Sequence, residues 1–522
     1  MAPRCRLSIV HGTACAVVLA FSAAAVAGAD PTPTTGVTDL EAELFGETPS
    51  PGDADKEQDP KPAATPQHTT ITSLMQGTTT VGGRADLAVS GSRSTEEPPA
   101  SMVWRTRPAA YLFLDSRPRS DSRGYLRVSL TPRSAPGARV TGSGRTAAGT
   151  DSPSNLQLLE LWGKWQAPES GTFWTVGRQP LRWGAAQFWN PTDFMSPEVR
   201  DPLALFDDRS GVDAARVNIP FESENASLIF VASLMPPSPP QTADLVGSMS
   251  QTRDVQLAAR GEWSAGSAET AVSLAWSERG PTRTGLSLSV GAGPLDFVLE
   301  GACIARTNRT FFRRARSEED PSTGTEGAGS PSNPIVTTSR SQLCLPQAVA
   351  GLSWQYAYGN SDAVTLGGEY FWNGLGHDQP DLELAAAVTG NAGPLYIGQQ
   401  YAAAYGLLPG PGDWDDTSFQ AQAIMNLTDA SSLYRAAVVQ TFLKSSQLAL
   451  AATWRDGRGE FRLDEATVAR ALQNVRLPGS SSPPAAPAAP AAPTSSTAAD
   501  AARDYARQTP RLLIDATVSL SL

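Results

Sequence analysis

The residues of this chain that could act on a ligand are concentrated between positions 178 and 216. Arginines, aspartates and tryptophans occur there together: Arg178, Arg182, Trp183, Trp189, Asp193, Asp201, Asp207, Asp208, Arg209, Asp213 and Arg216. Opposite charges across a narrow, water-filled passage create a field transverse to the flow, which selects solutes by charge and dipole. The alternative is that these charges pair with one another and only hold the segment against a wall.

Side chains suited to catalysis are scarce. Apart from the N-terminal export signal described below, the histidines are His68 and His377. His377 lies in GLGHDQPD, and neither Asp378 nor Asp381 forms a triad with a serine in a recognisable setting. We therefore expect a solvated His377. The sequence has no C-x-x-C-H haem motif and no Gly-rich phosphate loop. It predicts no enzyme, no cofactor and no metal site.

The N-terminus has the pattern of a secretory signal. Arg4 and Arg6 precede an apolar run at 14–24, and cleavage is expected near Ala27 or Ala29. A membrane anchor is the weaker alternative, because the run is short and polar, Pro-rich chain follows. The chain has 41 basic and 52 acidic side chains, and without Arg4 and Arg6 the balance is 39 against 52, or −13. This acidic balance predicts no nucleic-acid partner.

Alternating apolar and polar residues predict β-strands through most of the chain. In 511–522, for example, Leu512, Ile514 and Leu520 share one face, and in 446–455 Leu450 and Trp454 do so. A soluble β-sandwich would alternate too. Three features favour a membrane barrel: the chain ends within an amphipathic strand, aromatic residues fall near strand ends, and long and short connections alternate.

The connection lengths also predict the strand number. The pattern gives strands at 83–90, 107–115, 123–131, 156–166, 171–179, 211–221, 225–234, 254–264, 268–277, 284–291, 294–304, 347–357, 362–372, 417–427, 431–442, 446–455 and 511–522. That number is odd, whereas bacterial barrels have an even one. A further strand at 459–465 makes it even. We therefore predict an all-β fold, a closed antiparallel transmembrane β-barrel of about 18 strands, with 16 as the alternative.

The domain organisation follows from these elements. We expect a signal peptide at 1–29, a disordered periplasmic tail at 30–68 and an outer-membrane barrel at 69–522. The predicted long external loops are 305–346, 373–416 and 466–510. Cys303 and Cys344 bound the first of these, and in an oxidising compartment they would pair in a disulfide worth about 2–4 kcal/mol. Two unpaired thiols are the alternative.

The connection at 180–210 is unusual, because it carries several aromatic residues where a solvated loop is expected. We expect it to fold into the barrel and narrow the channel. Arg178, Arg182 and Arg216 would then lie on the lumen side or just beyond it. Asn190-Pro191-Thr192-Asp193 within it reads as a turn in which Asp193 bonds local backbone.

Three motifs around this connection resemble those of porin-like bacterial outer-membrane barrels. They are GRQPLRWG, WNPTD and DPLALFDDRSGVDAAR, in this order. The nearest family is the alginate-export-like barrels. The resemblance implies an outer-membrane channel for small hydrophilic solutes or oligosaccharides. The alternative is a plugged barrel that serves as a binding or assembly partner in surface polysaccharide handling. Expected partners are outer-membrane lipid, the solute, and the barrel-assembly machinery, which would recognise the C-terminal strand 511–522.

Overall fold

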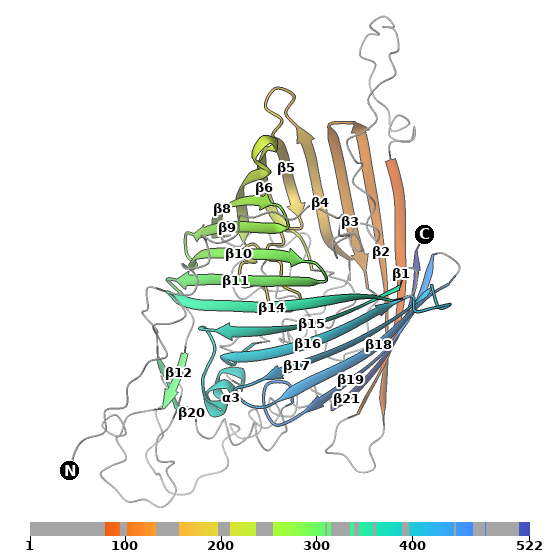
Figure 1. Ribbon diagram of the computed structural model, residues 1–522, viewed down its shortest axis with the longest axis vertical. Helices are drawn as coiled ribbons and strands as arrows, with labels where there is room; N and C mark the ends of the chain where they lie inside the picture. The colour runs from red at the N-terminus through yellow and green to blue at the C-terminus, as the bar shows by residue number, and fades with distance from the viewer. Residues whose placement is uncertain are drawn as a thin grey trace, which may run out of the picture. The chain divides into compact units, whose positions relative to one another are not determined.

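The chain forms a closed barrel, shown in Figure 1 as a computed structural model. The structure describes residues 79–93, 102–131, 156–196, 209–235, 254–307, 311–314, 335–338, 344–358, 362–388, 396–442, 445–462, 475–476 and 511–521. The predicted signal peptide at 1–29 and the tail at 30–68 lie outside these residues.

Eighteen of the described strands belong to one sheet. They are β1 (Thr79–Arg93), β2 (Val103–Arg119), β3 (Ser122–Leu130), β4 (Leu156–Gln166), β5 (Phe173–Gln179), β6 (Val212–Phe221), β7 (Ala226–Met235), β8 (Asp254–Ala265), β9 (Ala268–Ser277), β10 (Thr282–Ala292), β11 (Leu295–Ala305), β14 (Leu345–Tyr358), β15 (Asp362–Asn373), β16 (Gln400–Pro409), β17 (Thr417–Asn426), β18 (Ser432–Phe442), β19 (Ser446–Asp456) and β21 (Leu512–Ser521).

The sheet closes because its first strand pairs with its last. β1 is antiparallel to β2 and also to β21, with Leu87 opposite Val518. All neighbouring strands of this sheet are antiparallel and follow chain order. Closure leaves no strand edge unpaired. The predicted all-β fold and closed antiparallel barrel of 18 strands are confirmed. No helix among the described residues is long and apolar enough to span a membrane.

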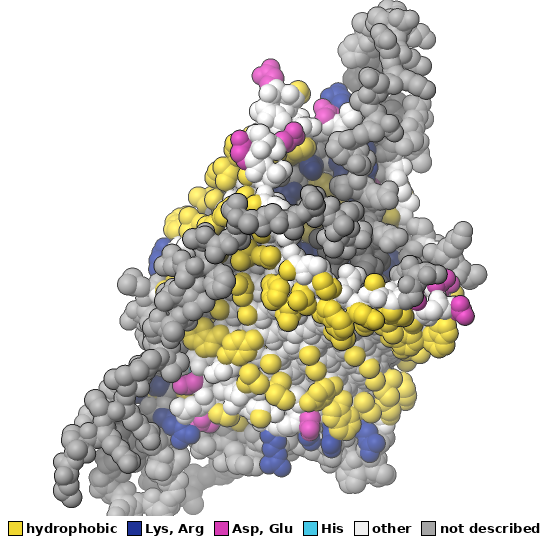
Figure 2. All heavy atoms as spheres, viewed as in Figure 1, with side chains coloured by type: hydrophobic (Ala, Val, Ile, Leu, Met, Phe, Trp, Pro, Cys, Tyr) yellow, Lys and Arg dark blue, Asp and Glu magenta, His cyan; other side chains and the backbone are white. Residues whose placement is uncertain are grey.

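The two faces of the sheet differ in polarity. Outward-facing apolar side chains are exposed, as at Leu450 (49%), Ile514 (38%) and Leu520 (46%). Figure 2 shows such side chains gathered over β14 to β19. The inward face carries polar side chains such as Thr453 and Ser519, which are buried. The predicted alternation in 446–455 and 511–522 is confirmed, and its apolar side faces outward as lipid contact requires.

Long connections gather at one end of the barrel, which we call the loop end, and short ones at the other, the turn end. The loop end includes connections 131–155, 180–211, 236–253, 306–344, 374–399 and 457–511. The turn end includes 120–121, 266–267, 293–294 and 410–416. This division is the one that outer-membrane barrels show between external loops and periplasmic turns.

One predicted strand is wrong and another was missed. Residues 459–462 form only an isolated bridge between Gly459 and Arg462, not a barrel strand. The missing strand is β16, which lies inside the predicted 373–416 loop. Its inward residues Tyr401 and Ala403 are apolar because they contact other buried side chains, so the sequence does not alternate. The predicted number of 18 strands is right. Because the missed strand precedes β17 and the wrong one follows β19, the short 427–431 connection lies at the loop end rather than at the turn end.

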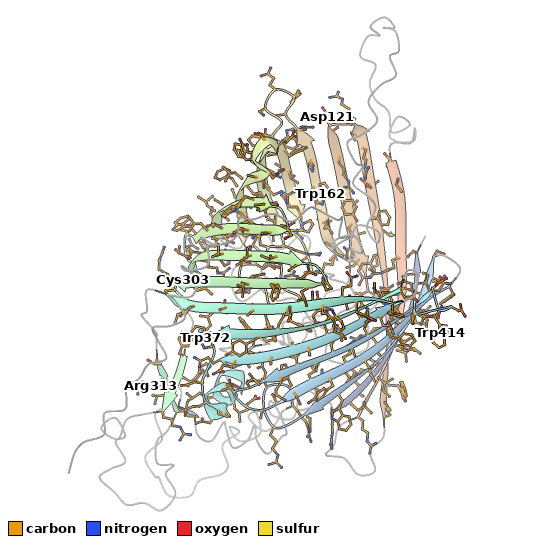
Figure 3. The ribbon with its side chains drawn as sticks, in the orientation of Figure 1. Asp121, Trp162, Cys303, Arg313, Trp372 and Trp414 are labelled. Carbon is orange, nitrogen blue, oxygen red and sulfur yellow. A yellow bond between two sulfur atoms is a disulfide. The ribbon has the colours of Figure 1, made fainter. Side chains whose placement is uncertain are left out.

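A small second sheet belongs to the loop end. β12 (Phe311–Arg314) and β13 (Ile335–Thr338) are antiparallel, and β20 (Val475–Arg476) pairs with β13 in parallel. Helix α3 (Pro380–Val388) packs on it through Leu382 and Ala386. At the base of the 306–344 connection, Cys303 and Cys344 are joined in a disulfide with their Cα atoms 5.2 Å apart (Figure 3).

Candidate functional site

The connection after β5 enters the barrel and reaches its far wall. We call residues 180–196 the crossing segment. Its backbone bonds to Glu369 on β15, and seven barrel strands separate β5 from β15 in one direction and nine in the other. Glu369 and its neighbour Phe371 share the inward face of β15, because Leu366 and Tyr370 on the opposite face are exposed. The segment therefore lies across the lumen.

Two buried carboxylates, one on β11 and one on β15, hold the segment. Glu300 on β11 accepts the N–H groups of Ala185 (2.5 Å) and Ala186 (3.0 Å) and the hydroxyl of Thr192 (2.8 Å). The carboxylate is 3% exposed, so these bonds replace those that water would make. Bonds from neutral donors to a charged acceptor are stronger than those between neutral groups.

Glu369 repeats the arrangement two residues further along the segment. Its carboxylate accepts the N–H groups of Gln187 (2.5 Å) and Phe188 (2.9 Å), and it is 8% exposed. Sequence reasoning missed both acids as functional residues. One sequence signal could have identified them: each is an acidic residue on the inward face of its strand, and its neighbours on the strand are apolar or small.

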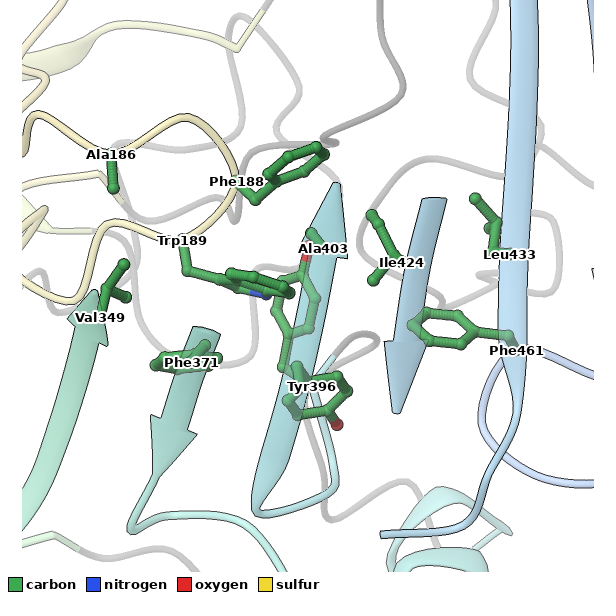
Figure 4. Close-up of a cluster of buried hydrophobic side chains, with 11 residues drawn as sticks. Ala186, Phe188, Trp189, Val349, Phe371, Tyr396, Ala403, Ile424, Leu433 and Phe461 are labelled. Carbon is green, nitrogen blue, oxygen red and sulfur yellow. The ribbon is translucent and has the colours of Figure 1, made fainter. Parts of the chain in front are cut away.

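Aromatic side chains complete the contact at the tip of the crossing segment. Trp189 stacks on Phe371 with ring centroids 5.5 Å apart and contacts Tyr396 (5.8 Å) and Tyr401 (6.0 Å). Phe188 meets the ring of Tyr405 at 5.8 Å. Figure 4 shows the Trp189 ring among the side chains of the wall. The tip is thus docked by packing as well as by hydrogen bonds.

The two ends of the crossing segment fill one side of the lumen. Leu181, Trp183, Phe194 and Met195 are buried against small or branched inward residues of β6 to β11, namely Val212, Ala214, Val231, Ala258, Ala275 and Ala302. Gly285 on β10 leaves room for this packing, since a Cβ there would lie 2.9 Å from both Phe194 and Thr192. The Phe194 carbonyl accepts bonds from Arg283 (2.9 Å) and Gln256 (3.2 Å).

The charged residues predicted from sequence form pairs in part. Arg209 binds the Asp193 carboxylate at 3.0 Å and the Ser196 hydroxyl at 2.9 Å. The other Asp193 oxygen accepts the Trp183 N–H at 3.3 Å, and the Asp193 N–H bonds to the Asn190 carbonyl at 3.0 Å. Residues 190–193 therefore form the predicted turn, and Asp193 fastens its backbone.

Arg178 and Asp213 form a two-bond ion pair at 2.7 and 3.0 Å between β5 and β6. Arg178 shares a strand face with Trp174 and Val176, whose side chains are exposed outward. Its predicted lumen-facing position is therefore wrong. Arg216 lies on the inward face instead, with Val212 and Ala214.

Of the remaining predicted residues, Arg182 is exposed and Trp183 and Trp189 are buried. Asp201, Asp207 and Asp208 lie outside the described residues. The structure thus brings the tryptophans, Asp193 and Arg209 together within or beside the crossing segment, and keeps the Arg178–Asp213 pair apart from them on the outward face.

The wall that the crossing segment does not cover is rich in charge. Inward-facing basic residues of β1 to β4 and of β18 and β19 are Arg84, Arg105, Arg107, Arg123, Arg127, Lys164, Arg435 and Arg455. Inward-facing acidic residues of β1, β2, β4 and β21 are Asp86, Asp115, Glu160 and Asp515. Several pair across strands, such as Arg123 with Asp115 at 2.9 Å and Arg127 with Glu160 at 3.4 Å. Basic groups outnumber acidic ones on this wall.

His377 has a structural setting. Its side chain is fully buried, and its Nε2 accepts the Phe312 N–H at 3.2 Å between β12 and the chain before α3. The expectation of a solvated histidine is wrong, because Phe311 and Phe312 of β12 pack against it. Within the described ranges, no group of three His, Cys, Asp or Glu side chains could hold a metal ion.

No protein-family model matches the chain, and no curated protein matches it either. Solved structures do. Wzi of Escherichia coli, an outer-membrane protein of group 1 capsule assembly described as a carbohydrate-binding β-barrel, has 10% identity and a TM-score of 0.45 over 86% of this chain and 85% of its own. OccK9 (OpdG) of Pseudomonas aeruginosa has 11% identity and a TM-score of 0.45 over 86% and 99%.

A porin of Rhodopseudomonas blastica, as a triple mutant, has 8% identity and a TM-score of 0.37 over 85% of this chain and 100% of its own. Similarities of this size indicate no shared substrate or partner. The chain's own structure, a closed antiparallel barrel that exposes apolar side chains on its outer face, has the architecture expected of a barrel that spans an outer membrane.

Proposed function

We propose that this protein is an outer-membrane channel for small hydrophilic solutes or oligosaccharides, with a passage restricted to one side of its lumen. The observation that carries the proposal is the anchoring of the crossing segment on Glu300 and Glu369. A segment fixed at its ends and at its tip divides the lumen. The side facing β6 to β11 is filled by buried apolar residues, and the side facing β1 to β4 is lined with half-buried charged ones.

The charge of that lining gives the passage a preference. Basic side chains on β1 to β4, β18 and β19 outnumber acidic ones, so the local potential favours anions. Arg216 and Lys164 contribute from neighbouring strands toward the turn end. In this account the paired residues Asp193 and Arg209 hold the segment in place, whereas the wall opposite sets selectivity.

The competing proposal is a barrel that conducts no solute. If the crossing segment closed the lumen completely, the protein would be a plugged barrel and would act as a binding or assembly partner in surface polysaccharide handling. The deep burial of Phe188, Trp189 and Met195 favours this second function. In either case we expect strand 511–522 to be the part that the barrel-assembly machinery recognises.

Planar-bilayer recording of the refolded protein, with salt gradients to measure ion selectivity, separates the two functions. Steady single-channel openings with anion preference support the channel. A barrel that inserts, migrates as a folded, heat-modifiable species and yet passes no current supports the plug. Deletion of residues 183–208 is the second test: higher conductance with the barrel still folded indicates a restriction, and loss of folding indicates a structural plug.

A further inference from the structure

The loop end contains a buried group of acidic side chains that the channel account does not use. Glu383 comes from α3, Asp429 from the connection between β17 and β18, and Glu460 from the chain after β19. Glu383 is 3% exposed and Glu460 is 8% exposed. We call these three residues the carboxyl cluster. It joins three connections that are far apart in sequence.

Glu460 fixes the chain that leads into β16. One of its oxygens accepts the N–H groups of Tyr396 and, at 3.3 Å, Ile397. The other accepts the Tyr401 hydroxyl at 2.5 Å. Tyr396 and Tyr401 are the rings against which Trp189 packs, so Glu460 supports the surface on which the tip of the crossing segment rests.

The three carboxyl groups lie together through shared partners. Asn426 donates to Glu460 and to Glu383, at 3.0 Å each. Asp429 accepts the backbone N–H of Glu460 at 2.6 Å and that of Ser431 at 2.7 Å. The second oxygen of Glu383 is buried and accepts no hydrogen bond from the described residues. A buried carboxylate oxygen without a donor favours the protonated acid.

Among the described residues, the groups whose charge acts on Glu383 and Glu460 are acidic or neutral. Glu383 faces Asp429 and Glu460, and Glu460 faces Asp429 and the Tyr401 phenol. Two described cations of the same connections bind other acids: Arg314 pairs with Asp381 at 2.8 Å and Arg462 with Asp456 at 3.9 Å.

Burial and the neighbouring charges change the acidity of the cluster. Burial, together with the charges of Asp429 and Glu460, raises the pKa of Glu383 to about 10. Burial also raises the pKa of Glu460 to about 7, although its hydrogen bond from Tyr401 opposes the shift. The packed cluster therefore holds protons that the same side chains would release in water.

We propose that the carboxyl cluster is a proton-controlled clasp, which holds residues 396–401 and, through Tyr396 and Tyr401, the tip of the crossing segment. Loss of its protons places like charges together in a buried site and loosens this contact. The lumen then widens as the tip leaves the wall. The inference rests on the proposed channel function, because the segment it releases is the one that narrows the passage.

The direction of the pH effect follows from linkage. The clasped form binds more protons than the loosened form, so the free energy of loosening falls as pH rises. Both Glu460 and Glu383 contribute from their ordinary pKa of 4.5 up to about 7, and Glu383 alone continues to contribute up to about 10. Each released proton changes the opening equilibrium by at most about tenfold per pH unit.

The experiment is single-channel recording of the refolded protein with both chambers at pH 5, 6, 7, 8 and 9. The wild-type open fraction is expected to rise over the whole range. Glu460→Gln should make the rise between pH 5 and 7 shallower, because only Glu383 then contributes in that range, and the double variant with Glu383→Gln should be flat throughout. Asp413→Asn, in the exposed β16–β17 turn, is the matched control and should follow the wild type.

A second readout does not need current. Hydrogen exchange of residues 185–190 and 396–401 in detergent is compared between wild type and Glu460→Gln at the same pH, and the wild type should exchange faster at pH 8. Should Glu460→Gln not fold, Asp429→Asn replaces it, and its open fraction at pH 9 should fall below that of the wild type.

The outcomes separate the clasp from the channel. If the wild type opens, an open fraction that does not change with pH overturns the clasp, and so does a Glu460→Gln open fraction that rises between pH 5 and 7 as steeply as that of the wild type. A protein that is silent at every pH but shows the difference in exchange supports the clasp and contradicts the channel. Silence with equal exchange in both proteins overturns both.

Discussion

The Glu369 carboxylate accepts the backbone N–H of Phe188 at 2.9 Å, and it thereby binds the chain that follows β5 to a strand on the far side of the barrel. With the parallel bonds of Glu300, this contact turns a loop into a crossing structure. The barrel wall supplies the acceptors and the loop backbone supplies the donors. The position of the segment is therefore set by main-chain atoms as well as by side chains.

Replacement of Trp189 by alanine should weaken the docking of the tip. The ring is 3% exposed and contacts Phe371, Tyr396 and Tyr401, so its loss should cost about 3–5 kcal/mol. Urea unfolding of the protein in lipid vesicles measures this change. Trp414→Ala, at a ring 59% exposed, is the control and should change little. Equal effects of the two variants would contradict the docking of Trp189.

A methyl group added at Gly285 should push the crossing segment off the wall. The new Cβ would lie 2.9 Å from Phe194 and from Thr192, so one of these side chains must move. We expect Gly285→Ala to cost about 1–3 kcal/mol and to raise conductance. Gly301→Ala is the matched variant, because its Cβ meets nothing within 4 Å. A Gly285→Ala protein as stable as Gly301→Ala would show that the segment does not pack there.

Charge reversal at Lys164 should lower the anion preference of the passage. The side chain lies on the inward face of β4 beside Arg123, with Arg216 also near, so a glutamate there gains cationic neighbours and should be tolerated. Reversal potentials in a salt gradient should show a severalfold lower ratio of anion to cation permeability. Lys164→Gln should give an intermediate value. An unchanged ratio of anion to cation permeability in both variants would show that the ions do not pass along this wall.

Loss of the disulfide should affect stability more than transport. Cys303 and Cys344 close the 306–344 connection, and the double serine variant should lose about 2–4 kcal/mol. Cys303 lies on the face of β11 opposite to Glu300, because Glu300, Ala302 and Ile304 share the buried face. Heat-modifiability on gels measures the first effect and bilayer recording the second. A large change in conductance would place this connection in the passage.

The alternation of strands such as 446–455 and 511–522 could be predicted because lipid and lumen impose opposite demands on successive residues. Gln400–Pro409 escaped prediction because its inward residues Tyr401 and Ala403 meet the packed tip rather than water. The prediction of a strand at 459–465 is wrong because Glu460 and Phe461 are both buried in loop-end contacts. The alternation of apolar and polar residues predicts the lipid-facing side of a strand well. It fails where packed side chains, rather than water, fill the lumen.

The functional site, like the fold, could be predicted from the sequence only in part. Segment 181–195 could be predicted to fold inward, because its tryptophans and phenylalanines need burial. Its anchors could not, since Glu300 and Glu369 bind backbone N–H groups more than 100 residues away, and no side-chain pattern marks such a bond. The charges that sequence analysis selected include Arg178, whose partner Asp213 is on the adjacent strand and whose face is outward.

The most direct test of the crossing segment is the single-channel conductance of a Glu300→Gln/Glu369→Gln protein beside that of the wild type, with Glu269→Gln, an exposed inward acid, as the control. Neutral amides keep the shape of the anchors and remove their charge. The account predicts a folded, heat-modifiable barrel with larger and noisier openings than either other protein. Openings identical to those of the wild type would contradict it.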